Sequence, residues 1–165
     1  MTAVAELEAS EKETMTKIVS HESNMEHYTA DAWCVECIDD RFRDVLDEVK
    51  RTEKWGNFDR TQWAGGAQEI ALEDPKSLTP VAEAILGQLA KSIKLHHTKS
   101  VVLTVHEACG AYGDVMPRDV DGGNKFMQEE LRKAAETVRV FLQNAGLDLP
   151  IRKCIVRSDG IYEVS

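Results

Sequence analysis

The sequence predicts an α/β fold, in which a mostly parallel β-sheet is flanked by helices and ends in an antiparallel C-terminal edge strand. Short apolar segments rich in β-branched residues alternate with longer segments whose apolar residues recur at helical spacing. This alternation is typical of a parallel sheet whose strands are joined through helices. An Asp159-Gly160 pair between two short runs near the C-terminus is typical of a hairpin, which makes the last strand antiparallel.

The composition indicates one folded domain preceded by a polar segment. The 165 residues are 42% hydrophobic and 30% charged, which is enough apolar material for a core. We expect residues 1–29 to form an N-terminal helical arm and residues 30–165 to form the domain. The formal net charge of −9 argues against a nucleic-acid partner and against an anionic membrane surface. Because no run of about 18 apolar residues and no secretory signal is found, we expect a cytoplasmic protein with no membrane partner.

The N-terminal half of the domain contains a strand, a helix and a second extended segment. Residues Ala32–Ile38 form an apolar run that suits a buried strand. Apolar residues at helical spacing follow within residues 39–54, so we expect one face of a helix to pack on the sheet. Residues Trp55–Trp63 are predicted to be extended, and Ala64-Gly65-Gly66 is predicted to be a tight loop where the backbone comes close to a neighbour.

The middle of the chain contains the clearest helix start and the clearest strand. Thr79 followed by Pro80 is typical of an N-cap and a first-turn proline, and apolar residues at helical spacing continue to Ile93. Val101–His106 is a β-branched run with no helix or strand breaker.

The C-terminal part is predicted to contain a loop, a long helix and two strands. Residues 111–125 are rich in Gly, Asp and Pro and are predicted to be a loop. A helical pattern follows and ends at Gly146, which is a typical C′ residue. Residues Ile151–Arg157 and Ile161–Val164 then complete the predicted hairpin.

Two short motifs contain the residues that are able to bind a metal or to catalyse a reaction, and each motif lies at the end of a predicted strand. The first is Cys37-Ile-Asp39-Asp40-Arg41, and the second is His106-Glu-Ala-Cys109-Gly110. In an open parallel sheet, ligands bind at the carboxyl ends of strands. If the two strands are neighbours, two thiolates and one imidazole meet at one point. Zinc accepts this ligand set, and three protein ligands leave a fourth position for water.

The two motifs together resemble those of the β-class carbonic anhydrases. A CxDxR motif followed by an HxxCG motif, on successive parallel strands, is the pattern of that family. Leu86-Gly87 before the strand Val101–His106 is similar to the family's helix-to-strand approach, and Ala64-Gly65 lies where the family has an Arg-Asn-Ala-Gly loop. The resemblance covers residues 30–165 in order, so the expected fold is β-carbonic anhydrase-like.

The resemblance implies a zinc-dependent lyase that hydrates carbon dioxide reversibly to bicarbonate through a zinc-bound hydroxide. It implies that Cys37, His106 and Cys109 bind Zn²⁺. It also implies that Asp39 and Arg41 form a catalytic carboxylate–guanidinium pair beside the metal. Asp39 can accept the hydrogen bond of the hydroxide, and Arg41 can keep Asp39 ionised and out of the fourth metal position.

Further implications concern the substrate side and the assembly. The glycine loop assigns Gly65 and Gly66 to substrate binding, and the family's usual assembly implies a homodimer or a higher homo-oligomer. Gln62-Trp63 replaces the family's Arg-Asn, so the substrate side departs from the family's pattern. Carbonyl sulfide or carbon disulfide hydrolysis on the same site remains an alternative.

Other interpretations of individual residues stay open at this point. Cys34 and Cys37 form a CxxC pair, which allows a closed, non-catalytic Cys3His zinc site or a redox pair. Residues three apart on a strand point to opposite faces, which favours Cys34 as a core residue, and Cys154 is expected to be core as well. By composition alone, the candidate proton carriers are His96, His97 and Glu107.

A calcium site is a weaker interpretation of the loop before the last long helix. Asp119-Val-Asp121-Gly122 faintly resembles a calcium loop, although the later acidic ligands and the glycine position do not fit one.

Overall fold

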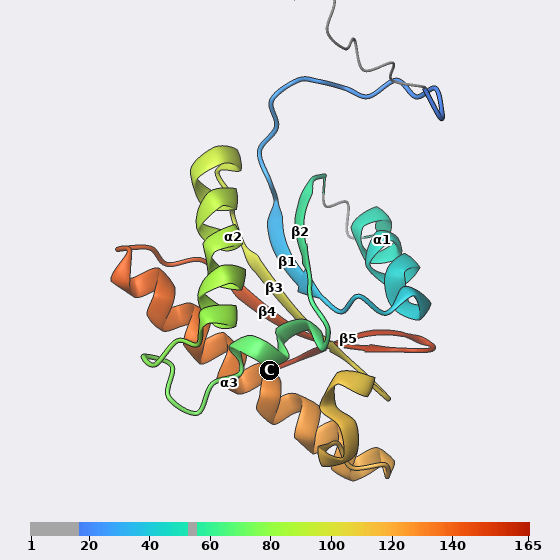
Figure 1. Cartoon of the computed structure of the whole chain (residues 1–165), viewed down its shortest axis with the longest axis vertical. Helices are drawn as coiled ribbons and strands as arrows, with labels where there is room; N and C mark the ends of the chain where they lie inside the picture. Colours follow the sequence, from blue (N-terminus) through green and yellow to red (C-terminus); the bar gives the residue numbers. More distant parts are fainter. Residues whose placement is uncertain (1–16, 53–55) are drawn as a thin grey trace, which may run out of the picture.

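Five strands form a single sheet in the order β2-β1-β3-β4-β5 in the computed structural model, which describes residues 17–52 and 56–165 (Figure 1). The pairs β1–β2, β1–β3 and β3–β4 are parallel, and β5 runs antiparallel to β4 at the edge. This confirms the predicted fold class. The strands are β1 (Ala32–Glu36), β2 (Phe58–Gln62), β3 (Val101–His106), β4 (Ile151–Arg157) and β5 (Gly160–Val164).

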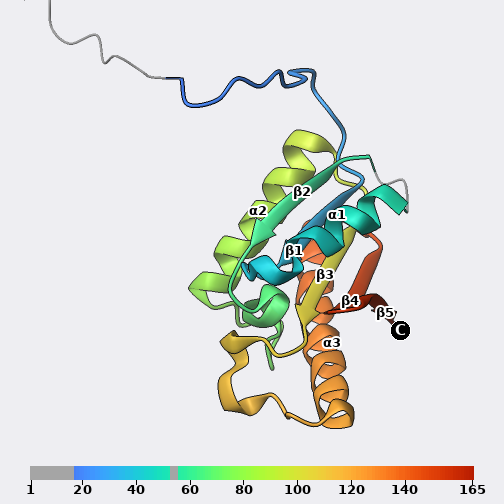
Figure 2. The ribbon, with the colours of Figure 1, turned by 90° about the vertical axis from the view of Figure 1, so that its right-hand side faces the viewer.

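Helices cover the two faces of the sheet unequally. The two longer helices lie on one face and α1 lies on the other, as Figures 1 and 2 show. On that second face, Arg60 of β2 binds Asp47 of α1 with an Nη2–Oδ1 distance of 2.6 Å. The helices are α1 (Arg43–Thr52), α2 (Pro80–His96) and α3 (Val120–Asn144), with 3-10 turns η1 (Asp40–Phe42), η2 (Gly66–Ile70) and η3 (Gly110–Val115).

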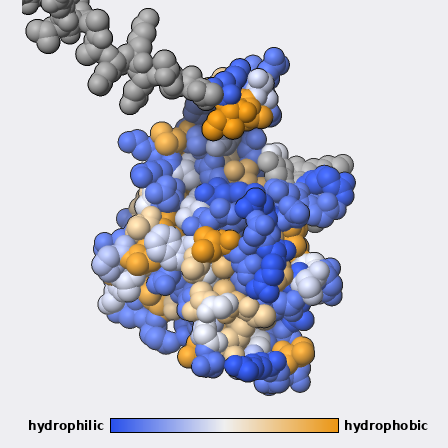
Figure 3. Space-filling view, turned by 45° about the vertical axis from the view of Figure 1, so that its right-hand side comes forward, coloured by the Kyte–Doolittle hydropathy of each residue, from blue (hydrophilic) through white to orange (hydrophobic). Residues whose placement is uncertain are grey.

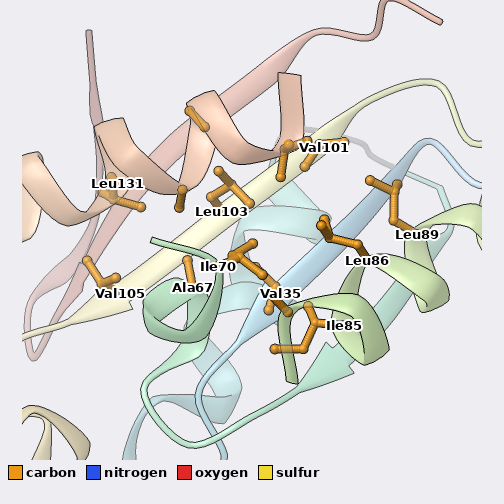
Figure 4. Close-up of a cluster of buried hydrophobic side chains, with 14 of the residues drawn as sticks. Val35, Ala67, Ile70, Ile85, Leu86, Leu89, Val101, Leu103, Val105 and Leu131 are labelled. Atoms are coloured by element: carbon orange, nitrogen blue, oxygen red, sulfur yellow. The ribbon is translucent and has the colours of Figure 1, made fainter. Parts of the chain in front are cut away.

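The main core lies between the sheet and the layer formed by α2, α3 and η2 (Figure 4). Alternate strand residues point into this layer, as the period of two requires. Each fully buried aliphatic side chain contributes about 1.5–3 kcal/mol through loss of apolar contact with water. The strand residues of this core include Val35, Val101, Leu103 and Val105, and its helical residues include Ile70, Ile85, Leu86, Leu89 and Leu131.

A smaller cluster occupies the opposite face of the sheet. Ala32, Cys34, Val102 and Cys154 are all buried there, with Phe58 and Ile161 packed against them at the sides. Cys34 and Cys154 are therefore core residues, as the strand period predicts.

The N-terminus of α2 follows the predicted pattern. The Oγ1 of Thr79 accepts the backbone N–H of Ala82 at 3.1 Å, and Pro80 occupies the first turn. The C-terminus of α3 also follows its predicted pattern. Gly146 has φ +70°, and the N–H of Leu147 donates to the carbonyl of Leu142, so the helix ends where the glycine predicts.

The start of α3 differs from the prediction of a loop over residues 111–125. Asp119 is an N-cap whose Oδ1 accepts the N–H of Gly122 at 2.7 Å, and the helix begins at Val120. A Cβ on Gly122 would lie 2.8 Å from the Cβ of Pro117, so this glycine serves close packing of the first helical turn. The capping role of Asp119 also removes the basis of the calcium interpretation.

The segment before the sheet is not helical where the structure describes it. Residues 17–29 contain no helix or strand, which corrects the expected helical arm over this part, and residues 1–16 lie outside the described residues. The hydroxyl of Tyr28 donates to Asp59 of β2 at 2.5 Å and so fixes the end of this segment on the domain. None of the described helices has the length and apolar character to cross a membrane. Figure 3 shows a mainly hydrophilic side of the molecule with small separate hydrophobic patches.

Candidate metal centre

The ends of two neighbouring parallel strands bring Cys37, His106 and Cys109 together. Cys37 follows the last residue of β1, one position beyond Glu36, and His106 is the last residue of β3. One nitrogen or sulfur atom from each of the three residues lies within 4.8 Å of the others, and the two Sγ atoms are 4.0 Å apart. The predicted adjacency of the two strand ends is therefore confirmed. Cys34, on the opposite face of the sheet, is not part of this group.

His106 presents an unpaired nitrogen to the two thiols. Its Nδ1 lies 2.8 Å from the backbone carbonyl of Glu107, a contact that favours the tautomer with hydrogen on Nδ1. Its Nε2 is buried and has no hydrogen-bond partner among the described residues. Burial lowers the pKa of His106, so the ring stays neutral and keeps a lone pair on Nε2. An orphaned buried nitrogen of this kind is costly unless a cation binds it.

The two thiols lie in surroundings that suit a cation between them. Burial raises the pKa of Cys109, and the nearby Cys37 raises it further. Two thiolates at this separation repel each other, and a divalent cation between them removes that repulsion. In a tetrahedral zinc site with Zn–S bonds of about 2.3 Å, the two sulfurs are about 3.8 Å apart. The observed 4.0 Å fits this value, and three donors leave a fourth position open.

Asp39 and Arg41 form a tight pair beside this group. The Nη2 of Arg41 donates to Oδ2 of Asp39 at 2.6 Å, and its Nε donates to Oδ1 at 3.0 Å. The backbone N–H of Arg41 also donates to Oδ1 at 3.1 Å. The hydrogen bonds from the Arg41 side chain lower the pKa of Asp39 to about 2. Asp39 is therefore a carboxylate at neutral pH, with Oδ2 3.8 Å from Nε2 of His106.

The glycine loop supports the site from the side of β2. Gly65 and Gly66 have φ values of +86° and +62°, a region that favours glycine. The N–H of Gly65 donates to Sγ of Cys37 at 3.3 Å. A Cβ on Gly66 would lie 2.4 Å from the carbonyl oxygen of Thr104, so only glycine allows this approach to β3. The sequence predicts the tight loop, but not the hydrogen bond to the sulfur.

Two further residues shape the centre and were not identified from the sequence. The ring of Phe42 lies 4.5 Å from the ring of His106, measured between centroids, and so supports the imidazole from one side. Ala108 has φ +51°, which is strained for a residue with a Cβ. This turn directly precedes Cys109, whose Sγ joins the group. Neither role has a signal in the motif, because the ring contact depends on packing between distant segments and the turn at Ala108 depends on backbone geometry.

Two of the three candidate proton carriers lie away from the metal centre. The carbonyl of His96 accepts the N–H of Ala30, which places His96 and His97 where β1 begins, at the opposite end of that strand from Cys37. The interpretation of these two histidines as proton carriers at this centre is therefore wrong. Glu107 does lie beside His106, and its Oε1 accepts the N–H of Ser158 at 2.7 Å.

Comparisons with known proteins support the fold. No protein-family model matches the chain, and no curated protein matches it by sequence. Among solved structures, carbonic anhydrase from Streptococcus mutans is similar at a TM-score of 0.51 and 20% identity, over 84% of each chain. β-Carbonic anhydrase isoform I from Trichomonas vaginalis is similar at a TM-score of 0.51 and 15% identity, over 87% of each chain. The chain thus has the fold of the β-carbonic anhydrases.

Proposed function

We propose that this protein is a zinc-dependent lyase that hydrates carbon dioxide reversibly to bicarbonate. The observation that carries the proposal is the unpaired, buried Nε2 of His106 facing the thiols of Cys37 and Cys109. The nearby Asp39–Arg41 pair adds the acceptor that such a reaction needs. When bound, zinc supplies a Lewis acid that activates water near neutral pH.

The chain's own residues have distinct roles in this proposal. Asp39 accepts a hydrogen bond from the attacking water and orients it toward the substrate carbon. Arg41 holds both oxygens of Asp39, which keeps the carboxylate ionised and out of the open metal position. Gly65 and Gly66 form part of the wall of the substrate site, and the Gly65 N–H stabilises the negative charge on the sulfur of Cys37.

The metal assignment is tested by zinc content. We expect about one zinc per chain in the purified protein and loss of zinc in Cys37→Ser and His106→Gln, because each removes one of three ligands. Cys34→Ser is the matched control, since it changes a buried cysteine on the other face, and it should retain zinc. Loss of zinc in Cys34→Ser would instead support a closed, non-catalytic zinc site.

The catalytic assignment is tested by Asp39→Asn in the zinc-loaded protein. We expect hydration of carbon dioxide, measured by stopped flow, to fall by about 10²-fold or more while zinc content stays constant. Undiminished hydration in this variant, or no hydration at any pH by the zinc-loaded wild type, would overturn the proposal. Faster release of sulfide from carbonyl sulfide than hydration of carbon dioxide would reassign the substrate to the sulfur analogue.

We also propose that the chain acts in the cytoplasm as a homodimer or a higher homo-oligomer. The four cysteines are free in the structure, which accords with a reducing compartment. Light scattering of the purified protein measures the assembly, and a monomer at all working concentrations would contradict it.

A further inference from the structure

A cavity of about 720 Å³ lies between the carboxyl ends of β3 and β4 and the first turns of α3. This volume is in the range of sites for small organic ligands, which are about 300–1,000 Å³. Met116 and Met127 contribute buried apolar surface to its wall, with relative exposures of 8% and 3%. The cavity is far larger than carbon dioxide needs.

Arg157, at the end of β4, gives this cavity an unneutralised positive charge. Its Nη2 donates to Oδ1 of Asn124, and its guanidinium lies over the ring of Tyr162, 5.4 Å from the ring centroid. Within the described residues, none of the ion pairs includes Arg157. A half-buried guanidinium without an acidic partner, in a largely apolar cavity, favours an anionic ligand.

The other charged groups in the wall have hydrogen-bond or ion-pair partners of their own, and within the described residues none of them forms an ion pair with Arg157. Arginines in the wall pair with aspartates, and acidic residues in the wall accept backbone N–H groups. These pairs are Arg41 with Asp39, Arg118 with Asp114, Glu107 with the N–H of Ser158, and Asp119 with the N–H of Gly122.

We propose that this cavity binds a small organic carboxylate. The carboxylate pairs with the guanidinium of Arg157, because the planar fork matches two carboxylate oxygens. The apolar body of the ligand contacts Met116 and Met127, which a simple inorganic anion cannot exploit. Cys109 and Arg41 also line the cavity, so the carboxylate site borders the candidate metal centre, but its pairing with Arg157 goes beyond the proposed hydration activity and needs no metal.

The five methionines of the chain make a direct test possible in the wild-type protein, first as purified and then after removal of the metal. We expect the ¹³C-methyl signals of Met116 and Met127 to shift saturably on addition of benzoate, a carboxylate with an apolar body. Met25 is the internal control, because it is 89% exposed in the N-terminal segment and should not shift. Benzamide, the neutral isostere, should bind at least about tenfold more weakly, and acetate should bind more weakly than benzoate.

Substitutions of Arg157 sharpen the test. Arg157→Gln should weaken benzoate binding about tenfold or more, and Arg157→Lys should retain part of it. Arg139→Gln is the control, since Arg139 is exposed on α3 and pairs with Glu136. Equal binding of benzoate and benzamide by the wild type overturns the proposal even if the Arg157 variants do not fold.

The result is separable from the test of the metal centre. Benzoate binding that persists without zinc and in His106→Gln supports the cavity site, whether or not the protein hydrates carbon dioxide. Binding only after zinc is added would place the anion on the metal and would overturn the proposal.

Discussion

Oδ2 of Asp39 lies 3.8 Å from Nε2 of His106, and the guanidinium of Arg41 holds it there. The carboxylate is thus close enough to be an additional metal ligand, yet both of its oxygens accept hydrogen bonds from Arg41. In the proposed zinc site, the competition between Arg41 and the metal for Asp39 would decide whether the fourth metal position stays open.

Replacing Arg41 tests this balance. We expect Arg41→Gln to keep its zinc but to lose about tenfold or more of the hydration rate, because Asp39 is freed to reach the metal. Metal analysis and stopped-flow hydration measure the two quantities. Arg43→Gln is the matched control, since Arg43 is exposed and pairs with Asp40. A rate in Arg41→Gln equal to that of the control would show that Arg41 has no such role.

Ala108 carries backbone strain that glycine can relieve. Its left-handed conformation costs about 1–2 kcal/mol in a residue with a Cβ, against about 0.5–1 kcal/mol for the greater unfolded-state freedom of glycine. We therefore expect Ala108→Gly to raise the free energy of unfolding by about 0.5 kcal/mol in urea titrations. Ala90→Gly, at an exposed position inside α2, should instead lower it by about 1 kcal/mol. Equal losses in both variants would contradict the strain argument.

Gly66 and Gly87 should respond to alanine in opposite directions. A Cβ on Gly66 would meet the Thr104 carbonyl oxygen at 2.4 Å, and its φ of +62° disfavours alanine as well. Gly66→Ala should therefore cost at least about 2 kcal/mol of unfolding free energy. Outside its chain neighbours and the adjacent helix backbone, no described heavy atom lies within 4 Å of a Cβ on Gly87, so Gly87→Ala should stabilise α2 by about 0.5–1 kcal/mol. Thermal unfolding followed by circular dichroism compares the two variants. An unchanged unfolding free energy in Gly66→Ala would contradict the close approach of Gly66 to the Thr104 carbonyl.

Tyr28 should make stability depend on pH in the alkaline range. Its hydrogen bond to Asp59, with burial as a smaller cause, raises its pKa from 10.0 to about 12. The neutral phenol is thus favoured in the folded state, so its contribution is complete below pH 10 and is lost as the pH rises to 12. We expect wild type to be more stable than Tyr28→Phe at pH 8, and the difference to shrink through this window. Urea unfolding at several pH values measures it, and a constant difference would contradict the assignment.

Local patterns predicted the elements whose signals are local. The N-cap at Thr79 and the strand ending at His106 are where the sequence indicates, because capping and β-branching act within a few residues. The sequence did not predict that α3 begins at Val120, because a glycine such as Gly122 is typical of a loop, whereas here it allows close contact with Pro117.

The candidate site also contains some features that local sequence patterns predict and others that they do not. The two motifs indicate the three candidate ligand residues because strand ends are recognisable, and the parallel sheet brings them together. The Gly65–Cys37 hydrogen bond depends on how a distant loop packs, which no short pattern encodes. His96 was misplaced because composition does not say at which end of the sheet a residue lies.

The candidate metal ligands come from two chain segments, since 72 positions separate Cys37 from Cys109. An ion held by both acts as a cross-link that forbids many extended arrangements of the denatured chain. For a permanent link closing a loop of this length, the entropic gain is about 4 kcal/mol. A metal bound at this centre would therefore also stabilise the fold, so that chelators would destabilise the whole sheet and metal loading would protect the chain from proteolysis.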